Sequence, residues 1–168
     1  MIVASDLARV GGENGEVVVG PETKIACDMA TKIARHSKTS LIVCTAGNAG
    51  KKWNHAWMGI IVGQYVVKQI DRDRFLAGKA SRFNTSGEMK ELARLARSER
   101  WENLHITLVV KWWHAPRAKF LCKLWLWRYF INAKVSVVKC ESHVGWHIIA
   151  AEYLLAWPKN LLWAIIGR

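Results

Sequence analysis

Apolar and polar positions follow two different periods along the chain. Short apolar runs of about five residues, rich in β-branched side chains, predict buried strands. Between them lie longer segments whose apolar positions recur every three or four residues, which is the helical period. The alternation predicts a three-layer α/β/α Rossmann-like fold with a roughly five-stranded parallel sheet. The expected strands are Ile2–Ser5, Leu41–Thr45, Tyr65–Ile70, Ile106–Val110 and Val135–Lys139.

The expected helices have recognisable starts. Pro21 follows a glycine-rich loop and opens a helix, with Ile25, Met29 and Ile33 on one face and Ala26 and Ala30 beside them. Thr85 and Glu88 have the spacing of a capping box, in which each side chain bonds to a free backbone N–H of the first turn. The other helices are expected at Trp53–Val62, Pro116–Tyr129 and Gly145–Trp157.

The length of 168 residues fits one domain with a single sizeable core. We expect a Rossmann-like domain at residues 1–157 and an apolar C-terminal tail at residues 158–168. Pro158 and Lys159 interrupt this tail, and no window offers the roughly 18 uncharged apolar residues of a membrane span. Trp157 and Trp163 suit a membrane interface, so peripheral membrane contact through the tail is a further expectation.

The composition and the start of the chain indicate the cellular compartment and the charge of a partner. The chain has four cysteines without a CxxC pair, which favours free thiols in a reducing compartment. Its start lacks the charged lead and long apolar region of a signal peptide, so we expect a cytoplasmic protein. The apolar fraction of 51% excludes a disordered chain, and the net charge of +12 favours an anionic partner. Charge alone does not choose among nucleic acid, acidic lipid and small phosphorylated molecules.

Polar and cationic side chains follow the expected strands. In an open α/β sheet, ligands bind beyond the carboxyl ends of the strands, so these side chains should meet along one rim. Arg74 and Lys111 are two of the cations. His114 and Arg117 stand where a strand runs into a helix, beside Trp113, and a helix N-terminus favours an anion. Single cations are usually only solvated, but this grouping indicates a binding site.

Other patterns give weaker indications. Asp6 follows the first strand and is a candidate general base, although it could equally cap the next turn. His143 and His147 have a metal-ligand spacing, but the sequence offers no matching third ligand, so we expect no metal. No dinucleotide fingerprint, phosphate-binding loop or GxSxG turn is present in the sequence. The basic residues gather at strand ends rather than along one face, which disfavours nucleic acid.

Four segments resemble, in order, motifs of the domain of unknown function shared by the bacterial SanA, ElyC and YdcF proteins. "VVKWWHAPRA" is similar to the family's "VTSxYHMxRA" turn, and "IVCTAG" to its "IVSGG" strand and loop. "SRFNTSGEMKEL" is similar to its "SxNTxENA" loop and helix start, and "IIAAEYL" to its closing "xxxREYL" helix. The resemblance implies a Rossmann-like fold, a nucleotide-like or S-adenosylmethionine-like ligand, and a link to cell-envelope precursor metabolism. It leaves open whether the protein is an enzyme, and it names no cofactor.

The resemblance also matches individual residues of the family's motifs to residues of this chain. His114 and Arg117 match the family's His and Arg, and Asn84 and Thr85 match its Asn-Thr. Glu152 matches its late Glu. We therefore expect His114 to act as an acid, a base or a hydrogen-bond donor, and Arg117 to clamp a phosphate or carboxylate.

Other positions depart from the family's pattern. Thr45 and Gly47 stand where the family has Ser and a second Gly, but Ala46 replaces the first Gly. Glu88 replaces an Asn, and a carboxylate there would repel an anion. The predicted site thus has His114 and Asp6 in catalytic roles. Its predicted ligand-binding residues are Thr45, Gly47, Asn84, Thr85, Glu88 and Arg117.

Overall fold

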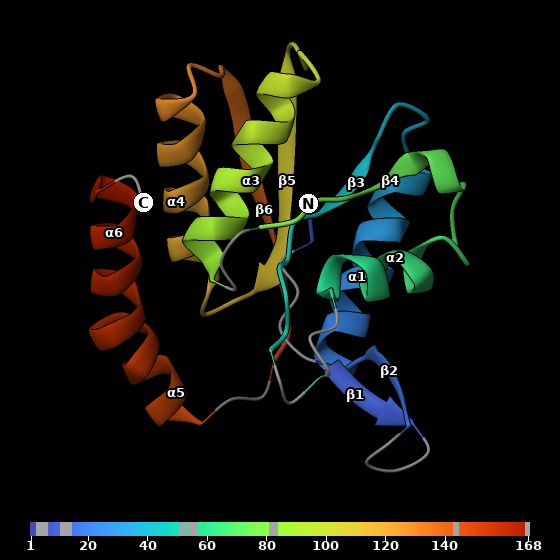
Figure 1. Ribbon diagram of the computed structural model, residues 1–168, viewed down its shortest axis with the longest axis horizontal. Coiled ribbons are helices and arrows are strands. Elements are labelled where there is room, and N and C mark those ends of the chain that lie inside the picture. Colours follow the sequence, from blue (N-terminus) through green and yellow to red (C-terminus); the bar gives the residue numbers. More distant parts are fainter. Residues whose placement is uncertain are drawn as a thin grey trace.

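The chain folds into a mixed α/β structure (Figure 1). The computed structural model describes residues 1–2, 7–10, 15–50, 53, 57–80, 84–142 and 145–166, without the side chain of residue 163. The helices are α1 (Pro21–Arg35), α2 (Met58–Val66), α3 (Thr85–Ser98), α4 (Ala115–Arg128), α5 (Trp146–Ala151) and α6 (Trp157–Ile166), with the short helices η2 (Arg72–Arg74) and η3 (Glu152–Ala156). The strands are β1 (Leu7–Val10), β2 (Glu16–Val19), β3 (Ile42–Cys44), β4 (Phe75–Ala77), β5 (Leu104–Lys111) and β6 (Ala133–Cys140).

The strands form pairs. β3 pairs with β4 and β5 with β6, both in parallel, while β1 and β2 form an antiparallel hairpin. Ile2 makes isolated parallel bridges to Cys44 in β3 and to Val109 in β5. The chain start therefore lies between the two parallel pairs, as the N label in Figure 1 shows.

Two apolar cores cover the parallel strands. Val43 and Leu108 belong to the core formed with α3 and α4, whereas their chain neighbours Cys44 and Val109 belong to the core formed with α1 and α2. Successive side chains of a strand point to opposite faces, so the two cores lie on opposite faces of these strands. Strands that are buried on both faces need apolar residues at every position, which explains the continuous apolar runs in the sequence.

Most of the expected strands are confirmed. Leu41–Thr45, Ile106–Val110 and Val135–Lys139 coincide with β3, β5 and β6 to within two residues at each end. In the expected strand Ile2–Ser5, Ile2 makes the two bridges, and residues 3–5 lie outside the described residues. The structure thus shows small parallel sheets of two strands each, rather than the predicted sheet of about five.

The expected strand at Tyr65–Ile70 is wrong, because α2 runs on through Tyr65 to Val66. Val62 and Val66 are both buried and lie four residues apart, which is a helical spacing. A short apolar run cannot by itself distinguish a buried helix from a buried strand. The strand that pairs with β3 is β4, for which the sequence analysis gave no strand, because the segment is rich in charged residues. The hairpin of β1 and β2 was likewise missed, because the glycines suggested a loop.

The predicted apolar face of α1 is confirmed in part. Ala26 and Ala30 are buried, together with Ala34, and Met29 is half-buried, whereas Ile25 and Ile33 are exposed. The alanines follow Ile25, Met29 and Ile33 by a single residue along the helix. Alanine brings little volume, so burying the alanine series lets α1 approach its neighbours closely, and the isoleucines are turned outwards.

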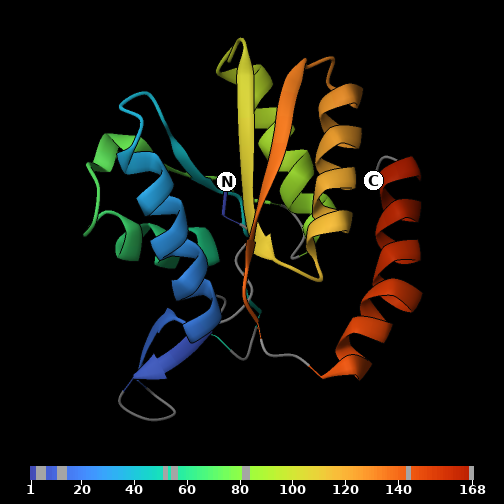
Figure 2. The same cartoon turned by 180° about the vertical axis from the view of Figure 1, so that it is seen from behind.

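The C-terminal segments α5, η3 and α6 form a continuous helical arm beside α4, clearest in the view from behind in Figure 2. The residues predicted as a tail continue this arm, since α6 extends to Ile166 and contacts α3 and α4. Pro158 lies inside the arm and has no backbone N–H to donate. The wider π-helical turn of η3 ends at Ala156, two residues before it. Among the described residues, no helix is long and apolar enough to cross a bilayer.

The contact between α2 and the strand ends predicts the effect of a small substitution. A Cβ atom at Gly59 would lie 3.1 Å from the carbonyl oxygen of Cys44 and 3.2 Å from that of Gly78. Backbone atoms cannot swing aside, so Gly59→Ala should lower the free energy of unfolding by about 1–3 kcal/mol. Gln64→Ala, on the exposed side of α2, is the control and should be neutral or slightly stabilising. Chemical denaturation measures both, and equal stabilities would contradict the packing.

Candidate functional site

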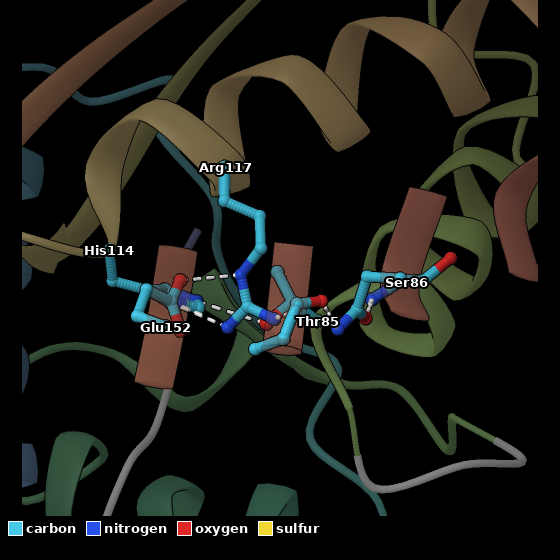
Figure 3. A network of polar contacts seen from close by, with 7 residues as sticks. Thr85, Ser86, His114, Arg117 and Glu152 are labelled. Atoms are coloured by element: carbon cyan, nitrogen blue, oxygen red, sulfur yellow. Dashed lines mark hydrogen bonds and ion pairs between the residues drawn. The ribbon is translucent and has the colours of Figure 1, made fainter. Parts of the chain in front are cut away.

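Four buried side chains from three separate segments meet beyond the carboxyl end of β5 (Figure 3). Thr85 begins α3, His114 precedes α4, Arg117 lies in the first turn of α4, and Glu152 begins η3. The Thr85 Oγ1 atom lies 2.9 Å from Nε2 of His114, and His114 Nδ1 lies 2.9 Å from Oε1 of Glu152. Arg117 Nε lies 2.6 Å from the same Glu152 oxygen. We call these four residues the His114 cluster.

Helix starts position two members of the cluster. Asn84 caps α3, since its side chain accepts a hydrogen bond from the Gly87 backbone N–H at 2.7 Å. The predicted capping box of Thr85 and Glu88 is therefore wrong: the cap lies one residue earlier. Thr85 is then the first residue of the helix, and its hydroxyl is available to His114. Pro116 stands in the first turn of α4, as predicted, with His114 immediately before the helix.

His114 serves as the hub of the cluster. Burial is the largest influence on its pKa and lowers it, so the imidazole is neutral at neutral pH. Its Nδ1 atom also lies 2.9 Å from Nη2 of Arg117. A neutral ring can donate from Nδ1 to Glu152 or accept there from Arg117, but it cannot do both. The Thr85 hydroxyl can donate or accept, so it satisfies Nε2 in either tautomer.

A hydroxyl, an imidazole and a carboxylate in sequence also form the relay that activates a nucleophile in many hydrolases. Here Thr85, His114 and Glu152 have the required distances. Thr85 is only 6% exposed, so its hydroxyl is closed to substrate in this conformation. The relay therefore positions His114 rather than presenting a nucleophile.

The network continues into the helical arm. The Ser86 backbone N–H donates to Oδ1 of Asn160 at 3.2 Å, and the Asn160 side chain donates to the Ala156 carbonyl at 2.8 Å. Trp125 of α4 donates to the Ser86 hydroxyl at 3.0 Å. Polar contacts thus fix the arm against both α3 and α4, and the cluster has a structural role besides any binding role.

Glu88 lies near the cluster with its side chain buried, at 4% exposure. Burial raises its pKa to about 8, although the nearby Arg117 charge acts in the opposite direction. Its Oε2 atom has no hydrogen-bond partner among the described residues. Glu88 is thus largely protonated at pH 7, and its carboxyl group can donate a hydrogen bond.

Partnerless buried polar atoms gather in this part of the molecule. Such atoms are rare in folded proteins, because each costs about 1–3 kcal/mol. Five such atoms are identified in the described residues. Each belongs to a residue at a strand exit, at the start of α3 or α4, or in the helical arm. The atoms are Thr45 Oγ1, Glu88 Oε2, Trp113 Nε1, Arg117 Nε and Trp157 Nε1. The Arg117 Nε contact with Glu152 is thus a close ion pair without the alignment of a hydrogen bond.

The structure brings together some of the predicted site residues and separates others. Thr85, His114 and Arg117 meet, and Glu88 lies close to Arg117. Asn84 is engaged as the cap of α3. Asp6 lies outside the described residues.

Thr45 and Gly47 are buried just after β3, and neither is a member of the His114 cluster. Glu152 was absent from the predicted ligand-binding set, although the resemblance pointed to it. The signal that could have found it is an acidic residue within an apolar segment, which needs a buried cation as partner.

The other polar side chains that the sequence singled out are not members of the His114 cluster. Lys111 forms an ion pair with Glu22 of α1. His143 lies outside the described residues, and within the described part of the chain no group of three or more His, Cys, Asp or Glu side chains could hold a metal. All four cysteines are free and buried, which confirms the interpretation of the cysteines as free thiols.

The buried Glu88 predicts a pH dependence of stability. Its pKa in the folded protein, about 8, lies above the value of 4.5 for a free carboxyl, so the folded state holds the extra proton between these pH values. Stability from this group is therefore complete below about pH 4.5 and falls as pH rises, by up to about 1.4 kcal/mol per unit.

Glu88→Gln removes this dependence. We expect the variant to match the parent near pH 5 and to exceed it in stability near pH 9, in urea denaturation at both values. A parent that loses no stability relative to the variant over this range would show that Glu88 is charged in the folded state.

Comparison of the chain with known proteins found no match. No protein family, no curated protein and no solved structure matches the chain. The resemblance to the SanA, ElyC and YdcF proteins therefore stays a prediction that rests on the four motifs quoted from the sequence. What can be said of function comes from the cluster itself and from the partnerless polar atoms around it.

Proposed function

We propose that the protein binds a small anionic or nucleotide-like ligand beyond the carboxyl ends of β3 and β5, beside the His114 cluster. In this proposal β4, β3, the N-terminal segment, β5 and β6 act as one Rossmann-like sheet. The observation that carries it is the concentration of partnerless buried polar atoms in the strand exits and helix starts. A ligand with several oxygen atoms would supply partners for such groups.

The cluster has the chemistry of an oxyanion site. Glu152 is itself a carboxylate, bound by a guanidinium and adjacent to an imidazole. Arg117 has five N–H groups, and its Nη1 atom makes only a long contact of 3.4 Å to the Ala156 carbonyl. A phosphate or carboxylate could take this donor together with the Nη2 donor in the bidentate geometry that arginine favours.

Protonation of Glu88 removes the repulsion of an anionic ligand that the sequence predicted for a carboxylate at this position. An ionised carboxylate beside Arg117 would compete with an anionic ligand and repel it. With its pKa raised to about 8 by burial, Glu88 is mainly neutral at pH 7 and can donate to the ligand. The resemblance supports a nucleotide-like or S-adenosylmethionine-like ligand, cell-envelope precursor metabolism as the setting, and an acid or base role for His114.

Substitution of Arg117 tests the proposed ligand site. Arg117→Ala would leave Glu152 buried without its cation, so loss of folding would obscure any loss of binding. Arg117→Lys keeps the charge but removes the planar fork. We expect it to weaken binding of phosphate, adenosine monophosphate or S-adenosylmethionine tenfold to a hundredfold, equivalent to about 1.5–3 kcal/mol. Isothermal titration calorimetry at pH 7 measures the change.

Arg94→Lys is the matched control, because Arg94 pairs with Glu91 on α3 and its side chain is half exposed. It should bind each ligand as the parent does. If folded Arg117→Lys protein binds every one of these ligands with the affinity of the parent, the ligand site lies elsewhere.

A second candidate function is contact with an acidic membrane surface. The exposed side chains of the helical arm support it. Several large apolar side chains of the arm are exposed, alongside the exposed cation Lys159. Apolar side chains beside cations suit the interface of an anionic bilayer, and the net charge of +12 adds attraction. The exposed side chains are Trp146, Ile148, Tyr153, Leu154, Leu155, Leu162, Ile165 and Ile166.

Vesicle sedimentation tests this second function. The parent should sediment with phosphatidylserine vesicles and remain in solution with phosphatidylcholine vesicles. Leu154→Ser with Leu155→Ser should reduce the bound fraction several-fold, because both side chains are exposed and their loss leaves the core intact. Val10→Ser, at an exposed apolar residue of the hairpin, is the control. Equal binding by parent and double variant would exclude the arm as the contact.

A further inference from the structure

The C-terminal end of α4 exposes two large aromatic side chains, which we call the aromatic tip. Trp127 lies in the last turn of the helix and is 74% exposed, and Phe130 follows the helix and is 91% exposed. Burial of such a ring stabilises a fold more than burial of most side chains, and both rings forgo that gain. A hollow of about 440 Å³ opens beside them, lined by Lys123, Leu126 and Asn132 among others. Exposed rings beside a hollow indicate a contact surface.

The backbone at Phe130 is also unfavourable for a bulky residue. The Phe130 N–H donates to the Trp127 carbonyl at 3.0 Å, and the Ile131 N–H donates to the Leu126 carbonyl at 2.9 Å. This pair of bonds ends a helix in the Schellman motif. The φ angle of Phe130 is 57°, in the left-handed region where glycine is favoured because a Cβ atom is crowded there. The chain thus keeps an aromatic residue at a position that suits glycine, although the core gains little from its exposed ring.

The segment that carries the aromatic tip has cations and no carboxylates. Lys119, Lys123 and Trp127 follow one another at four-residue spacing along the exposed side of α4, and Lys134 is exposed in β6. None of these lysines forms an ion pair with another of the described residues. The sequence from residue 103 to residue 140 contains no Asp or Glu. The tip therefore combines apolar rings with uncompensated positive charge.

We propose that the aromatic tip inserts into the interface of an anionic lipid bilayer, with the neighbouring lysines against the headgroups. Aromatic side chains gather at the interface between a bilayer and water, and each Lys near an anionic surface adds attraction. The proposal rests on the membrane function considered above for the arm, and it extends the contact to residues outside the arm. The net charge of +12 disfavours a second copy of this chain as the partner, because two copies would bring like charges together.

The position of the tip favours a bilayer over a protein partner. α4 lies between β6 and α6 (Figure 2), and Arg128 in its last turn donates to the Ala164 and Ile165 carbonyls near the end of α6. The tip therefore lies near the end of the arm, where Ile165 and Ile166 are exposed. Two different helices thus expose apolar side chains in one region. A bilayer accepts them without a shaped groove, whereas a protein partner needs a complementary surface for each helix.

Phe130→Gly separates binding from folding. Glycine suits the left-handed backbone, so the melting temperature of the variant should equal or exceed that of the parent. Its binding to phosphatidylserine vesicles should fall about tenfold, because one inserted ring is lost. Arg100→Gly is the matched control, since Arg100 has a φ angle of 52° and the same two hydrogen bonds end α3 there. It should show the same change in stability and bind within about twofold of the parent.

Vesicle sedimentation with the Leu154→Ser and Leu155→Ser double variant alongside separates the tip from the arm. The parent should sediment with phosphatidylserine vesicles and remain in solution with phosphatidylcholine vesicles. If the double variant loses binding while Phe130→Gly matches the parent, the arm is the contact and the tip is not. A parent that stays in solution with phosphatidylserine vesicles would overturn both. Equal losses in Phe130→Gly and Arg100→Gly would assign the effect to the helix ends and overturn the tip alone.

Discussion

The buried ion pair between Arg117 and Glu152 is the interaction on which the carboxyl end of the molecule depends. Both side chains are almost fully buried, so neither charge is solvated, and each needs the other. Glu152 lies in the helical arm and Arg117 in α4, while His114 connects both to Thr85 of α3. Loss of either charge would leave its partner uncompensated in the protein interior. The pair therefore fixes three helical segments relative to one another.

The same residues hold the arm and form the proposed ligand site. A site built on the first turns of α3 and α4 is rigid, which suits precise recognition. It also means that the arm closes one side of the site, because Glu152 enters it from η3. A π-turn at that point is consistent with a functional position, since such turns recur at functional sites. The arm thus connects the site to the exposed apolar surface that we consider for membrane contact.

The sequence predicted the parallel strands β3, β5 and β6 and the convergence of Thr85, His114 and Arg117, because apolar runs and helix starts are local signals. It did not predict β4. It failed where local signals were equivocal. Val62 and Val66 fit a helix as well as a strand, and the apolar side of α1 offered isoleucines and alanines alike, of which the alanines are buried. Glu88 was interpreted as a charged cap, whereas tertiary burial makes it largely neutral. Long-range pairings such as Arg117 with Glu152 depend on a fold that periodicity cannot supply.

The most direct test of the ligand site is the state of the His114 ring, observed by its two ¹⁵N chemical shifts at pH 7. The free protein should show a neutral imidazole. A phosphate or nucleotide that engages Arg117 would leave Glu152 as the partner of Nδ1, so its addition should shift both ring nitrogens saturably and increase protonation at Nδ1. The exposed His105 should stay unchanged. A His114 ring whose shifts do not change with saturating phosphate, adenosine monophosphate or S-adenosylmethionine would contradict a ligand site at this cluster.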